Sequence, residues 1–225
     1  MLYDNMLHFF NALLTVTELS MFIAGVTVCY YLKQLSHLYK LIGSYIGLSI
    51  LVELLTTYFM SSTGYNLFLL PVYSFAELAI FSTIYLCFFF EEEKSTLRNL
   101  LLLAHGLIIL DILFLCDLFN AETFYAFSKV VADIAIILLC LRYYWTILKE
   151  KTPIDKERLL LNSMFIGYFS INSIIFLSIN FLVNESLYLV TPFWMLNALS
   201  ALLLYSFLTY MIWQHGKTQK TSPYG

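Results

Sequence analysis

Seven long apolar stretches dominate this chain, and short polar segments separate each stretch from the next. A helix needs roughly 20 mostly apolar residues, each rising about 1.5 Å, to cross the hydrocarbon core of a bilayer. A single helix also satisfies its own backbone hydrogen bonds in lipid, which an isolated strand cannot do. The stretches therefore predict an all-α bundle of seven transmembrane helices at residues 9–32, 41–61, 67–90, 100–116, 124–148, 159–183 and 187–213.

The composition agrees with lipid as the main solvent. Of the 225 residues, 60% are hydrophobic and only 12% are charged, and the mean hydropathy is +0.80. A water-soluble domain with this balance would expose a large apolar surface. Because the longest polar segment covers only residues 149–158, we expect one domain over residues 1–225. We expect the lipid bilayer as its main partner, and no nucleic acid.

The basic residues lie almost entirely in alternate connections between the predicted helices. Eleven of the 12 lysines and arginines lie in or beside the first, third and fifth connections or in the tail: Lys33, Lys40, Lys94, Arg98, Arg142, Lys149, Lys151, Lys156, Arg158, Lys217 and Lys220. The second, fourth and sixth connections, near residues 63–64, 120–121 and 184–185, have none. Because cytoplasmic loops retain basic residues, this pattern predicts an external N-terminus and a cytoplasmic C-terminus.

A weak internal repeat appears when the chain is shifted by about 120 residues against itself. Ile46-Gly47 then aligns with Ile166-Gly167, and Pro71 falls within a residue of Pro192. This alignment predicts a three-plus-one-plus-three arrangement, in which helices one to three recur as five to seven. Chance likeness is the alternative, because apolar helices share many residue types.

Six ionisable residues fall inside the predicted spans: Glu18, Glu53, Glu77, Asp111, Lys129 and Asp133. Each costs several kcal/mol in hydrocarbon unless it is paired or hydrated, so each is a candidate for function. Lys129 and Asp133 are four residues apart and share one helix face. We expect these two side chains to form an ion pair or to bind a ligand together.

Neighbouring polar and aromatic residues extend the faces that carry these groups. Tyr73 precedes Glu77 by one turn, and Trp194 and Asn197 lie together near the start of the seventh helix. We expect a ligand-binding or proton-handling site composed of Glu18, Glu53, Glu77, Asp111, Lys129, Asp133, Asn172, Asn197, Tyr73 and Trp194. The structural alternative is that these groups only join helices by hydrogen bonds, as Asn, Ser and protonated acids often do.

The sequence gives no indication of a metal or cofactor. The four cysteines lie in or at the ends of helices without a paired spacing, and the seventh helix has no lysine for a retinal Schiff base. The histidines do not form the H-x-x-x-H pair used by zinc-dependent intramembrane hydrolases. We therefore expect no cofactor, no metal and no catalytic residues.

Four short motifs are spread over nearly the whole chain: Leu51-Val-Glu53, Tyr73-x-x-x-Glu77, Asp133 in the fifth helix and Phe193-Trp-x-x-x-Asn197. They resemble those of small, largely uncharacterised seven-span membrane proteins common in Bacteroidota. Such proteins are often encoded near sensor kinases, so the resemblance implies a sensory or signalling role. It also implies a multi-pass protein of the cell membrane, in particular the bacterial inner membrane.

Three functions fit these features. The first is a receptor-like or sensory protein that binds a small-molecule or lipid ligand between its helices and signals through a cytoplasmic partner at residues 149–158. The second is a proton-coupled small-molecule transporter that uses the same acids. The third is an intramembrane enzyme acting on lipid, although no nucleophile and base are recognisable, so an enzyme is the less favoured class.

The distribution of basic residues gives the first testable prediction. Tags at the N-terminus and near Gly64 should be reachable by an impermeant reagent on intact cells, whereas a tag near Lys149 should react only after lysis. A tag in the C-terminal tail serves as a second internal position. Labelling of the Gly64 position only after lysis would contradict the predicted orientation.

Overall fold

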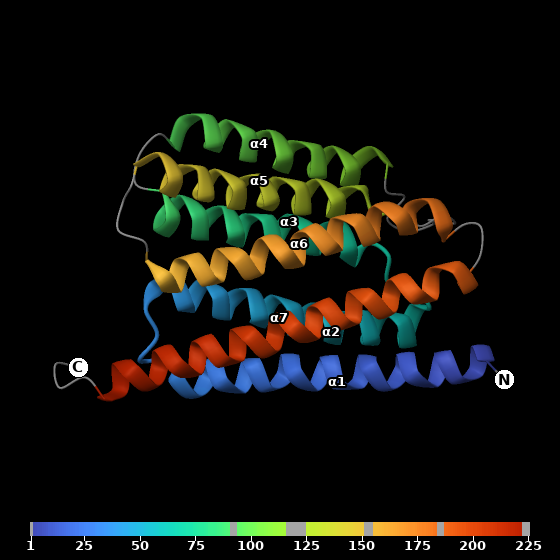
Figure 1. The fold of residues 1–225 in the computed structure, drawn as a ribbon. Helices are drawn as coiled ribbons and strands as arrows, with labels where there is room; N and C mark the ends of the chain where they lie inside the picture. Colours follow the sequence, from blue (N-terminus) through green and yellow to red (C-terminus); the bar gives the residue numbers. More distant parts are fainter. Residues whose placement is uncertain (1, 91–93, 116–124, 151–154, 184–186, 222–225) are drawn as a thin grey trace.

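The structure, a computed structural model, describes residues 2–90, 94–115, 125–150, 155–183 and 187–221. Within these ranges the regular secondary structure is entirely helical, and the helices lie side by side with alternating directions (Figure 1). They are α1 (Leu2–Tyr31), α2 (His37–Thr63), α3 (Leu69–Ile84), α4 (Lys94–Leu110), α5 (Phe127–Glu150), α6 (Lys156–Leu182) and α7 (Leu187–Thr221), with π-helical turns η1 (Tyr85–Phe89) and η2 (Asp111–Leu115) after α3 and α4. Seven of the described helices are long and apolar enough to cross a membrane, which confirms an all-α, multi-pass membrane protein.

Several helices extend beyond the predicted spans. α4 begins at Lys94 rather than at residue 100, and α7 continues to Thr221 rather than ending at 213. Apolar residues mark only the part of a helix that lies in lipid, while the backbone hydrogen bonds continue into polar sequence. The predicted ends at 116 and 124, the connections near 120–121 and 184–185, and residues 151–154 lie outside the described residues.

Local signals set some of the helix ends. Gly64 follows α2 with a φ of 72°, a left-handed conformation that glycine adopts without the cost of a Cβ. Asp155 begins α6, because its carboxylate accepts hydrogen bonds from the free N–H groups of Glu157 and Arg158 at 3.0 and 3.3 Å. Pro71 lies in the first turn of α3, where its missing N–H leaves no bond unmade.

Six helices form a closed ring in the order α1, α2, α3, α5, α6 and α7, with α7 packed extensively against α1. α4 lies outside this ring against α5 and α3, at one edge of the bundle in Figure 1. The two termini lie at opposite ends of the bundle (Figure 1), which we call the N-terminal end and the C-terminal end. Large apolar side chains cover much of the outer surface, as expected for contact with lipid.

Aromatic side chains fill the centre of the ring. The ring of Phe81 in α3 makes edge contacts with Tyr45 of α2 at 5.1 Å and with Phe165 and Phe169 of α6 at 4.9 and 4.8 Å between ring centres. All four side chains are almost completely buried. Such edge contacts are favourable beyond the burial of their area, so Phe81 joins three helices at one point.

A polar junction joins three elements at the C-terminal end. The hydroxyl of Tyr39 in α2 donates to Oε1 of Glu157 in α6 at 2.5 Å, and the ring of Tyr39 stacks on that of His215 in α7. Nδ1 of His215 lies 3.3 Å from the same carboxylate oxygen, and its Nε2 accepts from the N–H of Ser36 at 3.4 Å. Any shift of α7 relative to α2 or α6 therefore changes these contacts.

Two glycines of α2 give a matched test of the packing between α1 and α2. A Cβ at Gly43 would lie 2.7 Å from a methyl of Val28 in α1, whereas a Cβ at Gly47 meets no atom within 4 Å. Because the β-branched Val28 moves little, Gly43→Ala should lower stability by about 1–3 kcal/mol. Gly47→Ala should leave stability unchanged or slightly higher, because Ala favours the helix. Thermal unfolding of the two purified variants in detergent checks this, and equal midpoints would contradict the packing.

Candidate ligand-binding site

Lys129 of α5 contacts a carboxylate on each of two helices. Its Nζ lies 2.6 Å from Oε2 of Glu77 in α3 and 2.6 Å from Oδ1 of Asp133, one turn further along α5. Exposure of these side chains is 3% or less. The contact expected between Lys129 and Asp133 is thus confirmed, and Glu77 joins it from another helix. We call these three residues the buried ion-paired cluster.

Aromatic rings enclose the ammonium of this cluster. Nζ of Lys129 lies 5.3 Å from the ring centre of Phe169, 5.7 Å from that of Tyr73 and 5.9 Å from that of Phe176. The faces of such rings attract a cation. The hydroxyl of Tyr73 also donates to Oε1 of Glu77 at 2.8 Å. The cluster is therefore buried among aromatic side chains, and Oδ2 of Asp133 has no hydrogen-bond partner among the described residues.

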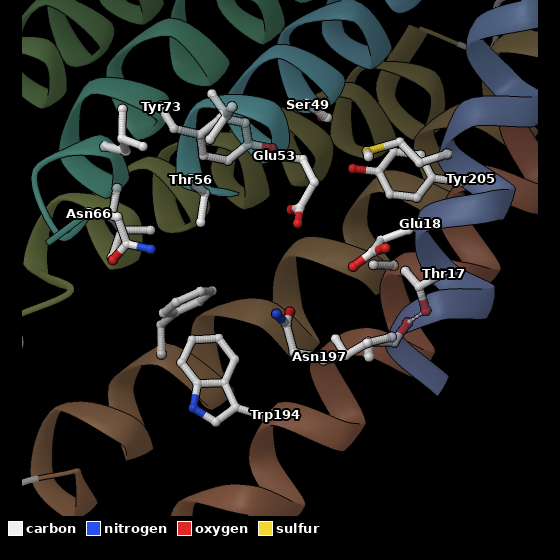
Figure 2. Close-up of a pocket in the computed structure, with 18 of the residues that line it drawn as sticks. Thr17, Glu18, Ser49, Glu53, Thr56, Asn66, Tyr73, Trp194, Asn197 and Tyr205 are labelled. Atoms are coloured by element: carbon white, nitrogen blue, oxygen red, sulfur yellow. Dashed lines mark hydrogen bonds between the residues drawn. The ribbon is translucent and has the colours of Figure 1, made fainter. Parts of the chain in front are cut away.

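A separate cavity of about 560 Å³ lies between α1, α2, α3, α6 and α7, and we call it the α2–α7 pocket. Its polar lining residues are Thr17, Glu18, Ser49, Glu53, Thr56, Asn66, Tyr73, Tyr168, Trp194, Asn197 and Tyr205. Figure 2 shows the carboxylates of Glu18 and Glu53 directed into the cavity, with Asn197 and Trp194 facing them across it. A cavity of this size, with mostly apolar walls and a few convergent polar groups, is typical of small-molecule sites.

Several polar groups of the pocket have no partner in the part of the chain that the structure describes. Among the described residues, the carboxylates of Glu18 and Glu53 and the side-chain amide of Asn197 make no hydrogen bond or ion pair. The two carboxylates are close enough to interact electrostatically. The side chain of Tyr168 is 93% buried (7% exposed), and its hydroxyl likewise has no described partner. Glu18 is exposed and Glu53 and Asn197 are half-buried, so these groups can bond to a ligand or to water in the cavity.

Two tyrosines separate the pocket from the buried ion-paired cluster. Tyr73 lines the pocket and donates to Glu77, and Tyr168 lines the pocket while lying close enough to Lys129 to interact electrostatically. The single pocket expected from the sequence is therefore divided into two neighbouring sites. Glu18, Glu53, Tyr73, Trp194 and Asn197 line the open one, while Glu77, Lys129 and Asp133 form the closed one.

Asp111 belongs to neither site. It is buried in the π-helical turn η2, where its Oδ2 accepts from the backbone N–H of Ser128 at 3.2 Å and from the hydroxyl of Ser128. Ser128 lies in the first turn of α5, so Asp111 satisfies a free N–H there and places a negative charge at the positive end of the helix. Asp111 does not line the α2–α7 pocket, because α4 lies outside the ring, and its predicted part in ligand binding or proton handling stays a prediction.

Asn172 also lies away from the pocket lining. It is 1% exposed, and its Oδ1 has no hydrogen-bond partner among the described residues.

The sequence interpretation missed Tyr168 and Tyr205 as lining residues. Tyr205 follows Asn197 by eight residues, which is about two helical turns along one face of α7. Helical spacing could therefore have identified Tyr205. Tyr168 carries no such signal, because a tyrosine in an apolar helix is most often a packing residue.

Removal of Lys129 tests the buried ion-paired cluster. Lys129→Met leaves two buried carboxylates without a counter-charge and should lower stability by about 3–5 kcal/mol. The triple variant Lys129→Met, Glu77→Gln, Asp133→Asn removes all the charges and should recover much of that loss. Thermal unfolding in detergent provides the comparison. If the triple variant shows the sum of the three separate effects, the groups do not stabilise one another.

Comparisons with known proteins assign this chain to no family. Within the described residues, His, Cys, Asp and Glu form no group of three or more that could hold a metal ion. No protein-family model, curated protein or solved structure matches the chain. The chemistry of the site is therefore inferred from its own side chains.

Proposed function

We propose that this protein is a receptor-like sensory protein of a cell membrane that binds a small amphipathic ligand in the α2–α7 pocket. The proposal is carried by one observation: the polar groups of Glu18, Glu53, Asn197 and Tyr168, around a cavity between five helices, lack partners among the described residues. A ligand that contacts these groups touches helices from both halves of the ring, so it can favour one arrangement of the helices over another.

The proposed orientation has the N-terminus outside, in a bacterial inner membrane. It is supported by the basic residues of alternate connections and by the resemblance to seven-span proteins encoded near sensor kinases. Asn66 and Leu67, in the connection after α2, line the pocket, so in this orientation the ligand enters from the outer side.

The proposed signal passes along α7 to the C-terminal end. Pro192 lies inside α7 and cannot donate its backbone hydrogen bond, which weakens the helix just before the pocket residues Trp194 and Asn197. A change of bend at this point would shift the far end of α7, where His215 contacts Glu157. Glu157 lies within residues 149–158, the proposed binding segment for a separate cytoplasmic partner.

A proton-coupled carrier is the second candidate, favoured by the order of helices in the ring. In a three-plus-one-plus-three repeat, α1, α2 and α3 correspond to α5, α6 and α7, and α4 lies outside. Each contact between neighbours must then occur twice: α1–α2 as α5–α6, α2–α3 as α6–α7, and α3–α5 as α7–α1. The contacts between helices include all these pairs. A carrier would use Glu53, whose partnerless carboxylate faces the pocket, as the proton-handling group.

Transport measurements separate the two candidates. Vesicles containing the purified protein, with an imposed proton gradient, should show no accumulation of labelled amines, amino acids or sugars above that of empty vesicles. Glu53→Gln keeps the shape of the side chain but cannot release a proton, so a carrier would lose flux in this variant. Asp155→Asn, at the other end of the bundle, is the control because Asn also caps a helix. Gradient-driven accumulation abolished by Glu53→Gln alone would replace the sensory proposal with the carrier.

A further inference from the structure

We infer that the ligand of the α2–α7 pocket is an organic ammonium ion with an apolar body. The inference rests on the proposed function only in taking this pocket as the ligand site. It specifies the charge and the chemical class of the ligand, and it holds for a receptor and for a carrier alike.

Charge is the first argument. The described lining residues include the carboxylates of Glu18 and Glu53, and none of them is Lys, Arg or His. The adjacent ion-paired cluster shows how this protein satisfies buried carboxylates, because Lys129 lies 2.6 Å from both Glu77 and Asp133. No described residue of the protein does the same for Glu18, which is exposed, and Glu53, which is half-buried, so a ligand cation in the cavity would supply their counter-charge.

Aromatic side chains are the second argument. Trp194, Tyr73, Tyr205 and Phe176 line the same cavity as the two acids. Aromatic faces attract cations, most strongly when water is excluded. In the adjacent buried ion-paired cluster, the ammonium of Lys129 lies within 6 Å of the centres of three such rings. The free hydroxyl of Tyr168 and the amide oxygen of Asn197 can accept the N–H groups of an ammonium.

The other lining residues and the volume of the cavity favour an organic cation over an inorganic one. Leu14, Met21, Val52 and Leu70 contribute to a lining that is mainly apolar, and the volume of about 560 Å³ far exceeds that of a bare metal ion. Metal sites in proteins require several oxygen, nitrogen or sulfur ligands close together. Among the described residues, His, Cys, Asp and Glu form no such group of three or more, whereas an apolar ligand body fits these walls.

Matched ligands that differ only in charge test the inference. The probes are 2-phenylethylammonium, 2-phenylethanol and phenylacetate, together with the larger naphthylethyl series, titrated calorimetrically into purified protein in detergent with empty micelles as the blank. The ammonium should bind at least about 10-fold more tightly than the alcohol, and the carboxylate should not bind, because a charged hydrogen bond is worth about 10- to 100-fold in affinity.

Variants locate the effect in the pocket. Glu18→Gln and Glu53→Gln should each weaken ammonium binding by about 10- to 100-fold, while Glu53→Asp, which keeps the charge, should preserve the preference over the alcohol. Ser44→Ala, on the exposed face of α2 and outside the pocket lining, is the control and should change nothing. Thermal unfolding of each variant checks that it is folded.

Four results would overturn the inference: equal binding of alcohol and ammonium, preference for the alcohol or the carboxylate, full binding in the double variant Glu18→Gln, Glu53→Gln, or no binding of either ammonium. These results are distinct from a failure of the sensory proposal. Ammonium binding accompanied by gradient-driven flux in vesicles would leave the ligand class intact and make the protein a carrier. Preference for the alcohol or the carboxylate without flux would reject the ligand class and leave the sensory proposal standing.

Discussion

The contact of Lys129 with two carboxylates is the interaction on which the rest of the bundle depends. An ammonium cannot remain in a low-dielectric interior without close partners, and here Glu77 and Asp133 supply them from α3 and α5. The cluster therefore fixes the register of α3 against α5. Because α3 also packs on α2, and α5 on α6, this one contact joins the two halves of the ring.

The α2–α7 pocket lies next to that closed cluster and differs from it in how its acidic residues are partnered. Its acids, Glu18 and Glu53, face a cavity and lack partners among the described residues, although they are the same chemical group as Glu77. Tyr73 forms the boundary, with its hydroxyl on Glu77 and its side chain in the pocket wall. A structural acid and a candidate binding acid thus differ in burial and in the presence of a partner, and not in residue type.

The position of α4 explains why one intramembrane acid serves neither purpose. Outside the ring, α4 contributes to the bundle through its packing on α5 and α3 and through Asp111, which binds the first turn of α5 at Ser128. A π-helical turn begins at Asp111, and such turns change the direction in which side chains point. Asp111 thereby stabilises the start of the helix that carries Lys129 and Asp133, at Ser128, the residue directly before Lys129.

The sequence by itself determined the helical class and the approximate position of each span, because the thickness of a bilayer sets the number of consecutive apolar residues. It also determined the Lys129–Asp133 contact, because a spacing of four places both side chains on one helix face. Only the tertiary structure decided that Glu77 meets Lys129 while Glu53 faces a cavity. Each has a polar residue one turn earlier, Tyr73 and Ser49, so their sequence surroundings are alike. Contacts between helices depend on the rotation of each helix and on the order of its neighbours, and a helix that is apolar on every side carries no pattern that specifies its inner face.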